Sequence, residues 1–351
     1  ALAVPVRGKA AAVPVSGARR RSLASSTSSS SSSSSQRRCR CESAVRDFVD
    51  ARADLRGSSF VLSGGLRVET LEGTAGATSS SSSSSSLPNL LFLHGSYHGA
   101  WCWAPNFFGF FSERGYRCRA MSFLGQALSD VPQEGKASGT VASHARDVAE
   151  YLATLEGNTV VIAHSFAGLI LQKMLQLDAG RPLSKVAGAA FLCSVPPTGN
   201  SAMAGRFFRR TPIAALKLTW AFVTRNFESD LDALRETFFS DDVAPKDLQE
   251  YQALIADSCK KPMLDLGRLS DELPIVFSEE AARVPALVLG AGDDRLVDTE
   301  ALEELASAFR SNGDGKGAQQ PVLMRSVAHD CMLDTRWEEV AERILAFLET
   351  L

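Results

Sequence analysis

Residues 160–168 have the sequence Val-Val-Ile-Ala-His-Ser-Phe-Ala-Gly, and a leucine-rich helical pattern follows at once. The β-branched run predicts a buried strand, and the abrupt change after it predicts a sharp turn into a helix with Ser165 at the apex. Such a turn, called a nucleophile elbow, usually has the pattern G-x-S-x-G because strand and helix pass close together there. Ala163 and Ala167 occupy the two glycine positions, and alanine is the next smallest residue. This departure weakens the motif, so the prediction also depends on partners elsewhere in the chain.

A serine hydroxyl becomes a good nucleophile only when a base takes its proton, and a third group must orient that base. The chain has five histidines. In the elbow architecture the order along the chain is serine, acid and then histidine, and only His329 follows Ser165. His329 is therefore the predicted base. His164, beside the serine, is interpreted as a packed or capping residue.

The acid is expected in the loop 291–297, which follows a predicted buried strand. Asp293 and Asp294 are adjacent there, and neighbouring side chains in a loop point in different directions. Only one of the two can therefore reach the imidazole. Asp298 is a third candidate.

A tetrahedral oxyanion requires two donors that are already in place. One is expected to be the backbone N–H of Phe166, the residue after the nucleophile. The other is expected from a loop after an earlier strand, where Gly95 lets the backbone turn so that the Ser96 N–H faces the elbow. His94 and His98 of this loop are interpreted as loop-supporting residues that bind backbone groups, and not as catalysts.

Taken together, these motifs resemble the α/β-hydrolase superfamily over about residues 59–351. The resemblance rests on the elbow and on three further segments: His94-Gly95-Ser96-Tyr97-His98-Gly99-Ala100-Trp101-Cys102-Trp103, Gly290-Ala291-Gly292-Asp293-Asp294-Arg295-Leu296-Val297 and Ala328-His329-Asp330. The first of these resembles the methylesterase and hydroxynitrile-lyase branch and many bacterial hydrolases. The resemblance implies a Ser-Asp-His esterase mechanism without metal or organic cofactor. It also places the acid at Asp294, just before an x-aliphatic-aliphatic step.

The order of the other predicted elements agrees with an α/β fold, because strands alternate with helices as in a largely parallel sheet. The expected architecture is the α/β-hydrolase fold, with a mostly parallel central sheet flanked by helices and a helical cap inserted after the sixth strand. The predicted parts are a disordered N-terminal segment, a first core part, the cap and a second core part, at 1–58, 59–195, 196–283 and 284–351. Helices are expected in the cap at 212–226, 231–239 and 245–257. Most of its apolar side chains are expected to pack onto the core, and some to line a substrate pocket.

The N-terminal segment differs in composition from the rest of the chain. Residues 1–41 contain eight Lys or Arg and no Asp or Glu, whereas the whole chain has a net charge of −3. This acid-free composition, rich in serine, alanine and arginine, predicts a transit peptide, for a plastid more than for a mitochondrion. The alternative is a disordered arm that carries no targeting signal, on a cytoplasmic protein. The serine run at 79–86 is interpreted as an expanded loop.

Seven cysteines without regular spacing do not predict a disulfide framework. The sequence offers no transmembrane run, no metal-ligand cluster and no folded basic motif for nucleic acid. It does not indicate an oligomeric state. The predicted function is hydrolysis of a small-molecule ester with an apolar part, by an esterase, lipase-like enzyme or thioesterase. Two alternatives remain: a hydroxynitrile-lyase-like or acyltransferase activity on the same scaffold, and a non-catalytic receptor for a small ligand.

Overall fold

The computed structural model describes residues 43–74, 87–177, 183–310 and 320–351. The predicted transit peptide and the serine run 79–86 lie outside the described residues. Among those described, Ser43–Leu351 forms one compact unit.

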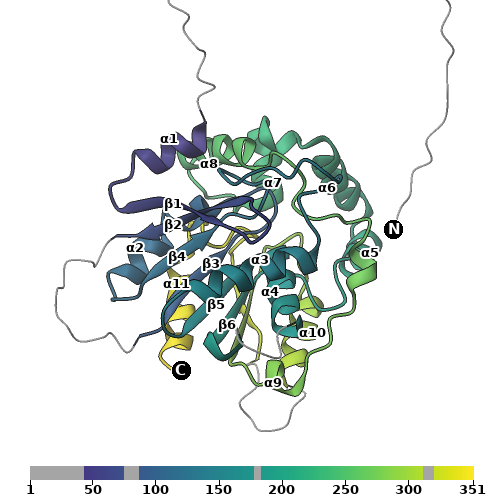
Figure 1. Ribbon diagram of the computed structural model, residues 1–351. Coiled ribbons are helices and arrows are strands. Elements are labelled where there is room, and N and C mark those ends of the chain that lie inside the picture. Colours follow the sequence, from purple (N-terminus) through teal and green to yellow (C-terminus); the bar gives the residue numbers. More distant parts are fainter. Residues whose placement is uncertain (1–42, 75–86, 178–182, 311–319) are drawn as a thin grey trace, which may run out of the picture. The chain divides into compact units, whose positions relative to one another are not determined.

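An eight-stranded sheet runs through this unit in the order β1-β2-β4-β3-β5-β6-β7-β8 (Figure 1). β1 and β2 are antiparallel to each other, β2 is antiparallel to β4, and the pairs from β4 to β8 are parallel. The strands are β1 (Leu55–Val61), β2 (Arg67–Gly73), β3 (Asn89–Leu93), β4 (Cys118–Met121), β5 (Thr159–His164), β6 (Val186–Leu192), β7 (Ala286–Ala291) and β8 (Val322–Met324). The predicted mostly parallel sheet is confirmed.

Helices cover both faces of the sheet. The α-helices are α1 (Ala44–Asp50), α2 (Phe107–Ser112), α3 (Val141–Thr154), α4 (Phe166–Leu177), α5 (Ser201–Arg210), α6 (Pro212–Thr224), α7 (Leu231–Phe238), α8 (Pro245–Ser258), α9 (Glu279–Ala282), α10 (Thr299–Arg310) and α11 (Trp337–Leu348). Four short 3₁₀ helices join them, namely η1 (Ala100–Trp103), η2 (Leu183–Lys185), η3 (Asn226–Glu228) and η4 (Leu269–Glu272). The Thr140 hydroxyl caps the N-terminus of α3 by accepting a hydrogen bond from the Ser143 N–H.

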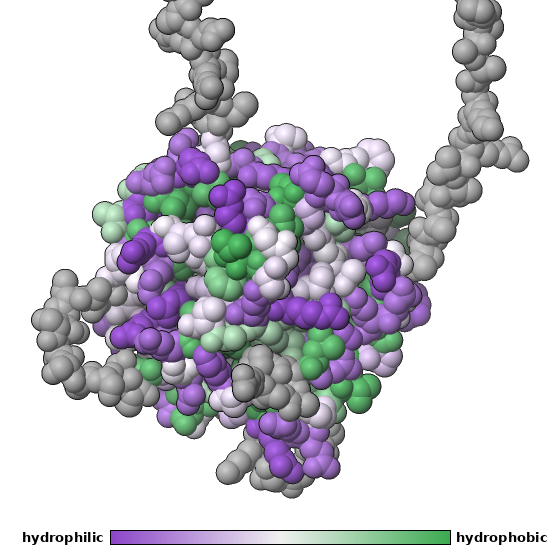
Figure 2. Space-filling model, in the orientation of Figure 1, coloured by the Kyte–Doolittle hydropathy of each residue, from purple (hydrophilic) through white to green (hydrophobic). Residues whose placement is uncertain are grey.

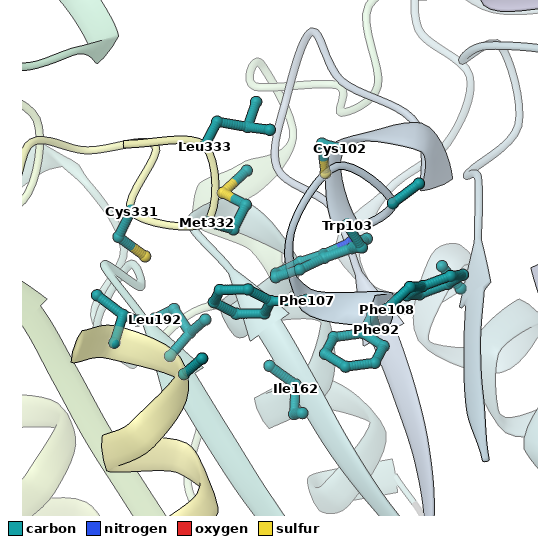
Figure 3. Packing of buried hydrophobic residues seen from close by; sticks show 14 of the residues in the cluster. Phe92, Cys102, Trp103, Phe107, Phe108, Ile162, Leu192, Cys331, Met332 and Leu333 are labelled. Atoms are coloured by element: carbon teal, nitrogen blue, oxygen red, sulfur yellow. The ribbon is translucent and has the colours of Figure 1, made fainter. Parts of the chain in front are cut away.

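Two hydrophobic clusters lie on opposite faces of the sheet, because side chains alternate along each strand. On β5, Val160 and Ile162 belong to the cluster that includes α2 and α11, whereas Val161 and Ala163 belong to the cluster that includes α3, α4 and α10. Figure 3 shows part of the first cluster. There Phe107 and Trp103 lie near Phe92 and Ile162, and Cys331, Met332 and Leu333 extend it to the chain that follows His329. Core packing therefore fixes the loop on which the predicted base lies.

The segment between β6 and β7 contains α5 to α9 and corresponds to the predicted cap. Figure 1 shows α6, α7 and α8 close together, with α1 beside α8. The three helices predicted there are present, and α5 and α9 are additional ones. The expectation that most apolar side chains of this segment pack onto the core is wrong for the outer face of α6. Its large exposed side chains are Ile213 (84%), Leu216 (61%), Trp220 (64%) and Val223 (75%).

On the face of the molecule in Figure 2, small hydrophobic areas alternate with hydrophilic ones. Within the described residues, no helix combines the length and the apolar character that crossing a membrane would require.

The predicted boundary of the disordered N-terminal segment at residue 58 is wrong, because residues 43–58 contain α1 and the start of β1. The Ser43 hydroxyl caps α1 by accepting from the Arg46 N–H, and it donates to Asp257 of α8 at 2.6 Å. Val45 and Val49 are buried, which fixes α1 against the core. A stripe of two valines is too short to stand out beside a long polar, basic segment.

Candidate active site

Ser165 lies at the sharp turn between β5 and α4, as the sequence predicts. Its φ of 57° is in the left-handed region, which a residue with a side chain adopts only when its surroundings impose it. The Ser165 N–H donates to the carbonyl of Leu192 on β6 at 3.0 Å. Gly168 of α4 lies close to the chain that follows β6, because a Cβ atom there would be 2.1 Å from Ser194 Oγ. This position therefore requires glycine, whereas the elbow holds alanine at 163 and 167, and both alanines are fully buried.

The side chains of Ser165, His329 and Asp294 form a continuous chain of hydrogen bonds. Ser165 Oγ lies 3.1 Å from Nε2 of His329, and His329 Nδ1 lies 2.8 Å from Oδ2 of Asp294. A carboxylate can only accept, so Nδ1 carries a proton and Nε2 of the neutral ring is free to accept from the Ser165 hydroxyl. The geometry therefore suits removal of the serine proton by His329.

The three candidate acids have different environments. Asp294 is held by its second oxygen, Oδ1, which accepts from the N–H groups of Leu296 and Val297 at 2.7 and 3.1 Å. Asp293 is exposed. Asp298 pairs with Arg206 at 2.6 Å. Of the three, Asp294 is the residue that the structure brings to His329.

The charge of Asp294 controls the proton affinity of His329. Complete burial lowers the pKa of the imidazole, but the neighbouring Asp294 carboxylate and its hydrogen bond outweigh this, so the pKa of His329 is raised above the ordinary 6.5.

We expect the acid limb of the kcat/KM profile of wild-type protein to have its midpoint above pH 6.5, the ordinary value for histidine. The reason is that His329 acts as a base only when neutral, and its raised pKa keeps it protonated to a higher pH. Hydrolysis measured between about pH 5 and 9 with a neutral ester checks this, with Ser194→Ala, a buried serine outside the hydrogen-bonded chain, as control. A midpoint below 6.5 would mean that another group limits the rate.

The loop after β3 lies directly against the elbow. A Cβ atom at Gly95 would be 3.0 Å from Ser165 Cβ and 2.9 Å from His164 Nδ1, so only glycine fits there. Tyr97 has a φ of 68°, which turns the chain sharply after Ser96. Within the described part of the chain, the backbone N–H groups of Ser96 and Phe166 have no acceptor. Both are therefore free to donate to a developing oxyanion.

The other histidines near the site bind backbone groups. His94 Nδ1 donates to the Gly95 carbonyl at 2.7 Å, and its Nε2 accepts from the Phe123 N–H at 3.0 Å. His164 Nε2 donates to the His329 carbonyl at 2.9 Å. Burial lowers the pKa of both rings to about 3, so they are neutral. These contacts agree with the supporting role predicted for His94 and with the packed role predicted for His164.

Sequence reasoning assigned no role to two groups at the site. The carboxyl of Asp330, which directly follows His329, is buried and bonded to His98 Nε2 at 2.9 Å. The feature of the sequence that could have indicated a role for Asp330 is its position next to the predicted base. The aromatic side chain of Phe238 from α7 also packs on the ring of His329, with centroids 6.4 Å apart. Its place in the inserted segment gave no indication of this contact.

The inserted segment limits access to the site. The ring of Phe238 touches Phe222 of α6, which in turn stacks on Tyr97 of the loop after β3. Ser165 is 8% exposed and His329 is 3% exposed. A cavity of about 470 Å³ opens beside the His329 loop, between α7 and the loops after β7 and β8. Polar and charged side chains make up most of the lining of this cavity, and neither Ser165 nor His329 belongs to it; the apolar groups at the site are the aromatic rings that pack on His329 and Tyr97.

Two groups of potential metal ligands occur among the described residues. They are His164, His329 and Asp330, and Cys193, Asp294 and His329, each with ligand atoms within 4.8 Å of one another. Both need a nitrogen of His329, and both nitrogens of that ring are engaged in hydrogen bonds with Ser165 and Asp294. An ion there would break the chain that orients the serine.

Comparisons with known proteins agree with this architecture. A model of the alpha/beta hydrolase family matches residues 90–343. Similar solved structures include an esterase from Rhodococcus sp., with a TM-score of 0.56 and 20% identity over 85% of this chain and 99% of that one. A bromoperoxidase from Bacillus anthracis has a TM-score of 0.60 and 16% identity over 84% and 100%. An epoxide hydrolase from Vigna radiata has a TM-score of 0.59 and 18% identity over 85% and 99%. A search of curated protein sequences found no match.

Proposed function

Since the chain belongs to the alpha/beta hydrolase family, we propose that it is a serine hydrolase of carboxylic esters. The observation that supports this most directly is the chain of hydrogen bonds from Ser165 through His329 to Asp294. The esterase among the similar structures is compatible with it. The epoxide hydrolase suggests another reaction, but epoxide hydrolases of this fold resemble the same pattern with an aspartate at the position of Ser165, so ester hydrolysis is favoured.

In the proposed mechanism, His329 Nε2 takes the hydroxyl proton of Ser165 as Oγ attacks the ester carbonyl. The backbone N–H groups of Ser96 and Phe166 donate to the resulting oxyanion. His329, held by Asp294, then gives the proton to the departing alcohol, which leaves an acyl group on Ser165. Water activated by the same imidazole releases the acid and restores the serine.

The proposed substrate is a small ester with an apolar part. Phe238 of α7 packs on the His329 ring, and Phe222 of α6 links it to Tyr97, so the inserted helices offer aromatic rather than charged side chains here. In this proposal α5 to α8 act as a cap that shields the bound apolar part of the ester from bulk water, while a water molecule can still reach the acyl-enzyme.

A panel of p-nitrophenyl esters with graded acyl length tests the proposed function. We expect turnover of the wild type to depend on acyl length, because the aromatic groups beside His329 bind apolar chains. Absence of turnover on the whole panel, with folded protein, would contradict the ester-hydrolase proposal. Product analysis with a cyanohydrin and with an added acceptor alcohol would then test the lyase and acyltransferase alternatives. Binding of a small ligand without turnover would support the receptor.

A separate proposal concerns the N-terminal segment, which is acid-free through residue 41. We propose that it directs the protein to an organelle, a plastid more than a mitochondrion. Because Ser43–Leu351 is compact by itself, deletion of residues 1–41 should leave esterase activity and melting temperature nearly unchanged. The same residues, fused to a fluorescent protein behind the complete native start, should carry it into an organelle. Diffuse cytosolic fluorescence would contradict the targeting proposal and leave the hydrolase proposal standing.

A further inference from the structure

A second histidine–carboxylate pair lies next to the Ser165–His329–Asp294 chain. His98 Nε2 is 2.9 Å from Oδ2 of Asp330, and the two side chains are 1% and 0% exposed. The two residues are 232 positions apart in the sequence. No role for this contact follows from the proposed mechanism, in which Asp294 alone orients His329.

The hydrogen bonds of His98 define its charge. Nδ1 lies 2.9 Å from the carbonyl oxygen of Ser96, and Nε2 faces the Asp330 carboxylate. A carbonyl and a carboxylate both accept, so each ring nitrogen must donate, and only the imidazolium form can do this. Burial raises the pKa of Asp330, but this is outweighed, chiefly by the hydrogen-bonded His98, and the pKa of Asp330 is lowered below its ordinary value. The contact is therefore a buried pair of opposite charges.

The pair joins the loop that contains Ser96 to the loop that contains His329. The proposed mechanism requires a fixed distance between these two loops. On one side, His98 donates to the carbonyl of Ser96, the residue whose own N–H is a proposed oxyanion donor. On the other side, Asp330 directly follows His329 in the chain, and its backbone N–H donates to the Phe238 carbonyl of α7 at 3.0 Å. A displacement of either loop would change the distance between the oxyanion donor and the base.

Asp330 does not duplicate the role of Asp294. Nδ1 of His329 is already bound to Asp294, at 2.8 Å. One oxygen of Asp330 binds His98, and the other lies 3.9 Å from His164 Nε2, which donates to a carbonyl. The Asp330 carboxylate therefore acts on the site through His98.

We propose that His98 and Asp330 are positioning residues, and that their ion pair holds the Ser96 N–H in register with Ser165 and His329 for the transition state. This inference rests on the proposed ester hydrolysis. It predicts that the pair affects the chemical step more than substrate binding, because the oxyanion exists only after attack.

The test uses two variants of the full chain, Asp330→Asn and His98→Gln, and their combination. Each single variant should lower kcat about 10- to 100-fold, the size expected when reacting groups are displaced by about 1 Å, with little change in KM. Affinity for a trifluoromethyl ketone, which forms a tetrahedral adduct with the serine, should fall by a similar factor. The double variant should be no slower than the worse single one, because the two residues act as a unit.

His144→Gln is the matched control. His144 is also buried and also binds a backbone carbonyl, here through Nε2 to Met263 at 2.9 Å, but its contacts lie outside the loops of Ser96 and His329. It should lose stability and keep kcat. Equal losses of kcat in all three single variants would show a merely structural effect and overturn the proposal. Additive losses in the double variant would also overturn it.

Nitrogen-15 NMR of the histidine rings provides a readout that does not need turnover. In the wild type at about pH 9, above the acid limb assigned to His329, one buried ring should still have both nitrogens protonated, and this signal should vanish in His98→Gln and become that of a neutral ring in Asp330→Asn. A neutral His98 in the wild type would overturn the ion pair even if both variants fail to fold. If the wild type hydrolyses no ester and the NMR result is as expected, the proposed function fails while the charged pair is established.

Discussion

Replacement of Ser165 by alanine should abolish ester hydrolysis, with a loss of about 10⁴- to 10⁶-fold in kcat. The hydroxyl is the only group of the elbow that His329 Nε2 can deprotonate, and the two atoms are 3.1 Å apart. Alanine keeps a Cβ atom at this position, so the turn and the hydrogen bond from the residue 165 N–H to Leu192 should persist. A fluorophosphonate probe with mass spectrometry should label the wild type once, at Ser165, and should not label the variant.

Ser194→Ala is the control for this experiment. Ser194 is buried near the elbow and donates to the carbonyls of Ala163 and Leu192, but its hydroxyl lies outside the chain that ends at Asp294. This variant should lose some stability, since two buried carbonyls lose a donor, and should keep its labelling and turnover. Undiminished turnover of Ser165→Ala, or labelling of another residue, would refute the mechanism.

The parts of the fold that sequence analysis predicted are those in which local pattern and long-range packing agree. The β-branched run of β5 is buried at every position, so hydrophobicity alone identifies it. The serine between small residues fits the sharp turn from β5 into α4, where Ser165 has a φ of 57°. The order of serine, acid and histidine then left one histidine, and the structure places it against Ser165.

The remaining features depend on contacts that no local pattern encodes. Helix α1 is fixed by two hydrogen bonds to Asp257, which is more than 200 positions away, at 2.6 Å from Ser43 and 3.0 Å from Val45. The bond between His98 and Asp330 likewise joins two loops that meet only in the folded chain. The expectation that apolar side chains pack onto the core failed for α6, because its apolar residues lie around the helix and give no preferred buried face.

The local sequence pattern also cannot decide which of the two adjacent aspartates contacts His329. A pair of substitutions tests the assignment of Asp294. Asp294→Asn should lower kcat by roughly 10⁴-fold, because an amide cannot hold the Nδ1–H tautomer as the carboxylate does, and Nε2 is then no longer free to accept the serine proton. The amide keeps the shape of the side chain, and its oxygen can still accept from the N–H groups of Leu296 and Val297, now bound to Oδ1. The loop should therefore stay folded, and hydrolysis of a p-nitrophenyl ester measures the loss directly.

Asp293→Asn is the matched control, since it makes the same chemical change one residue away. The Asp293 side chain is exposed, and the contact that fixes this residue is its backbone N–H bond to the Val327 carbonyl at 2.9 Å, which the substitution preserves. Its kcat should stay within about tenfold of wild type, because no hydrogen bond to His329 is lost. A severe loss in Asp293→Asn with a mild one in Asp294→Asn would move the acid to Asp293. Mild losses in both would point to Asp298, whose carboxylate would then have to leave Arg206 to reach the imidazole.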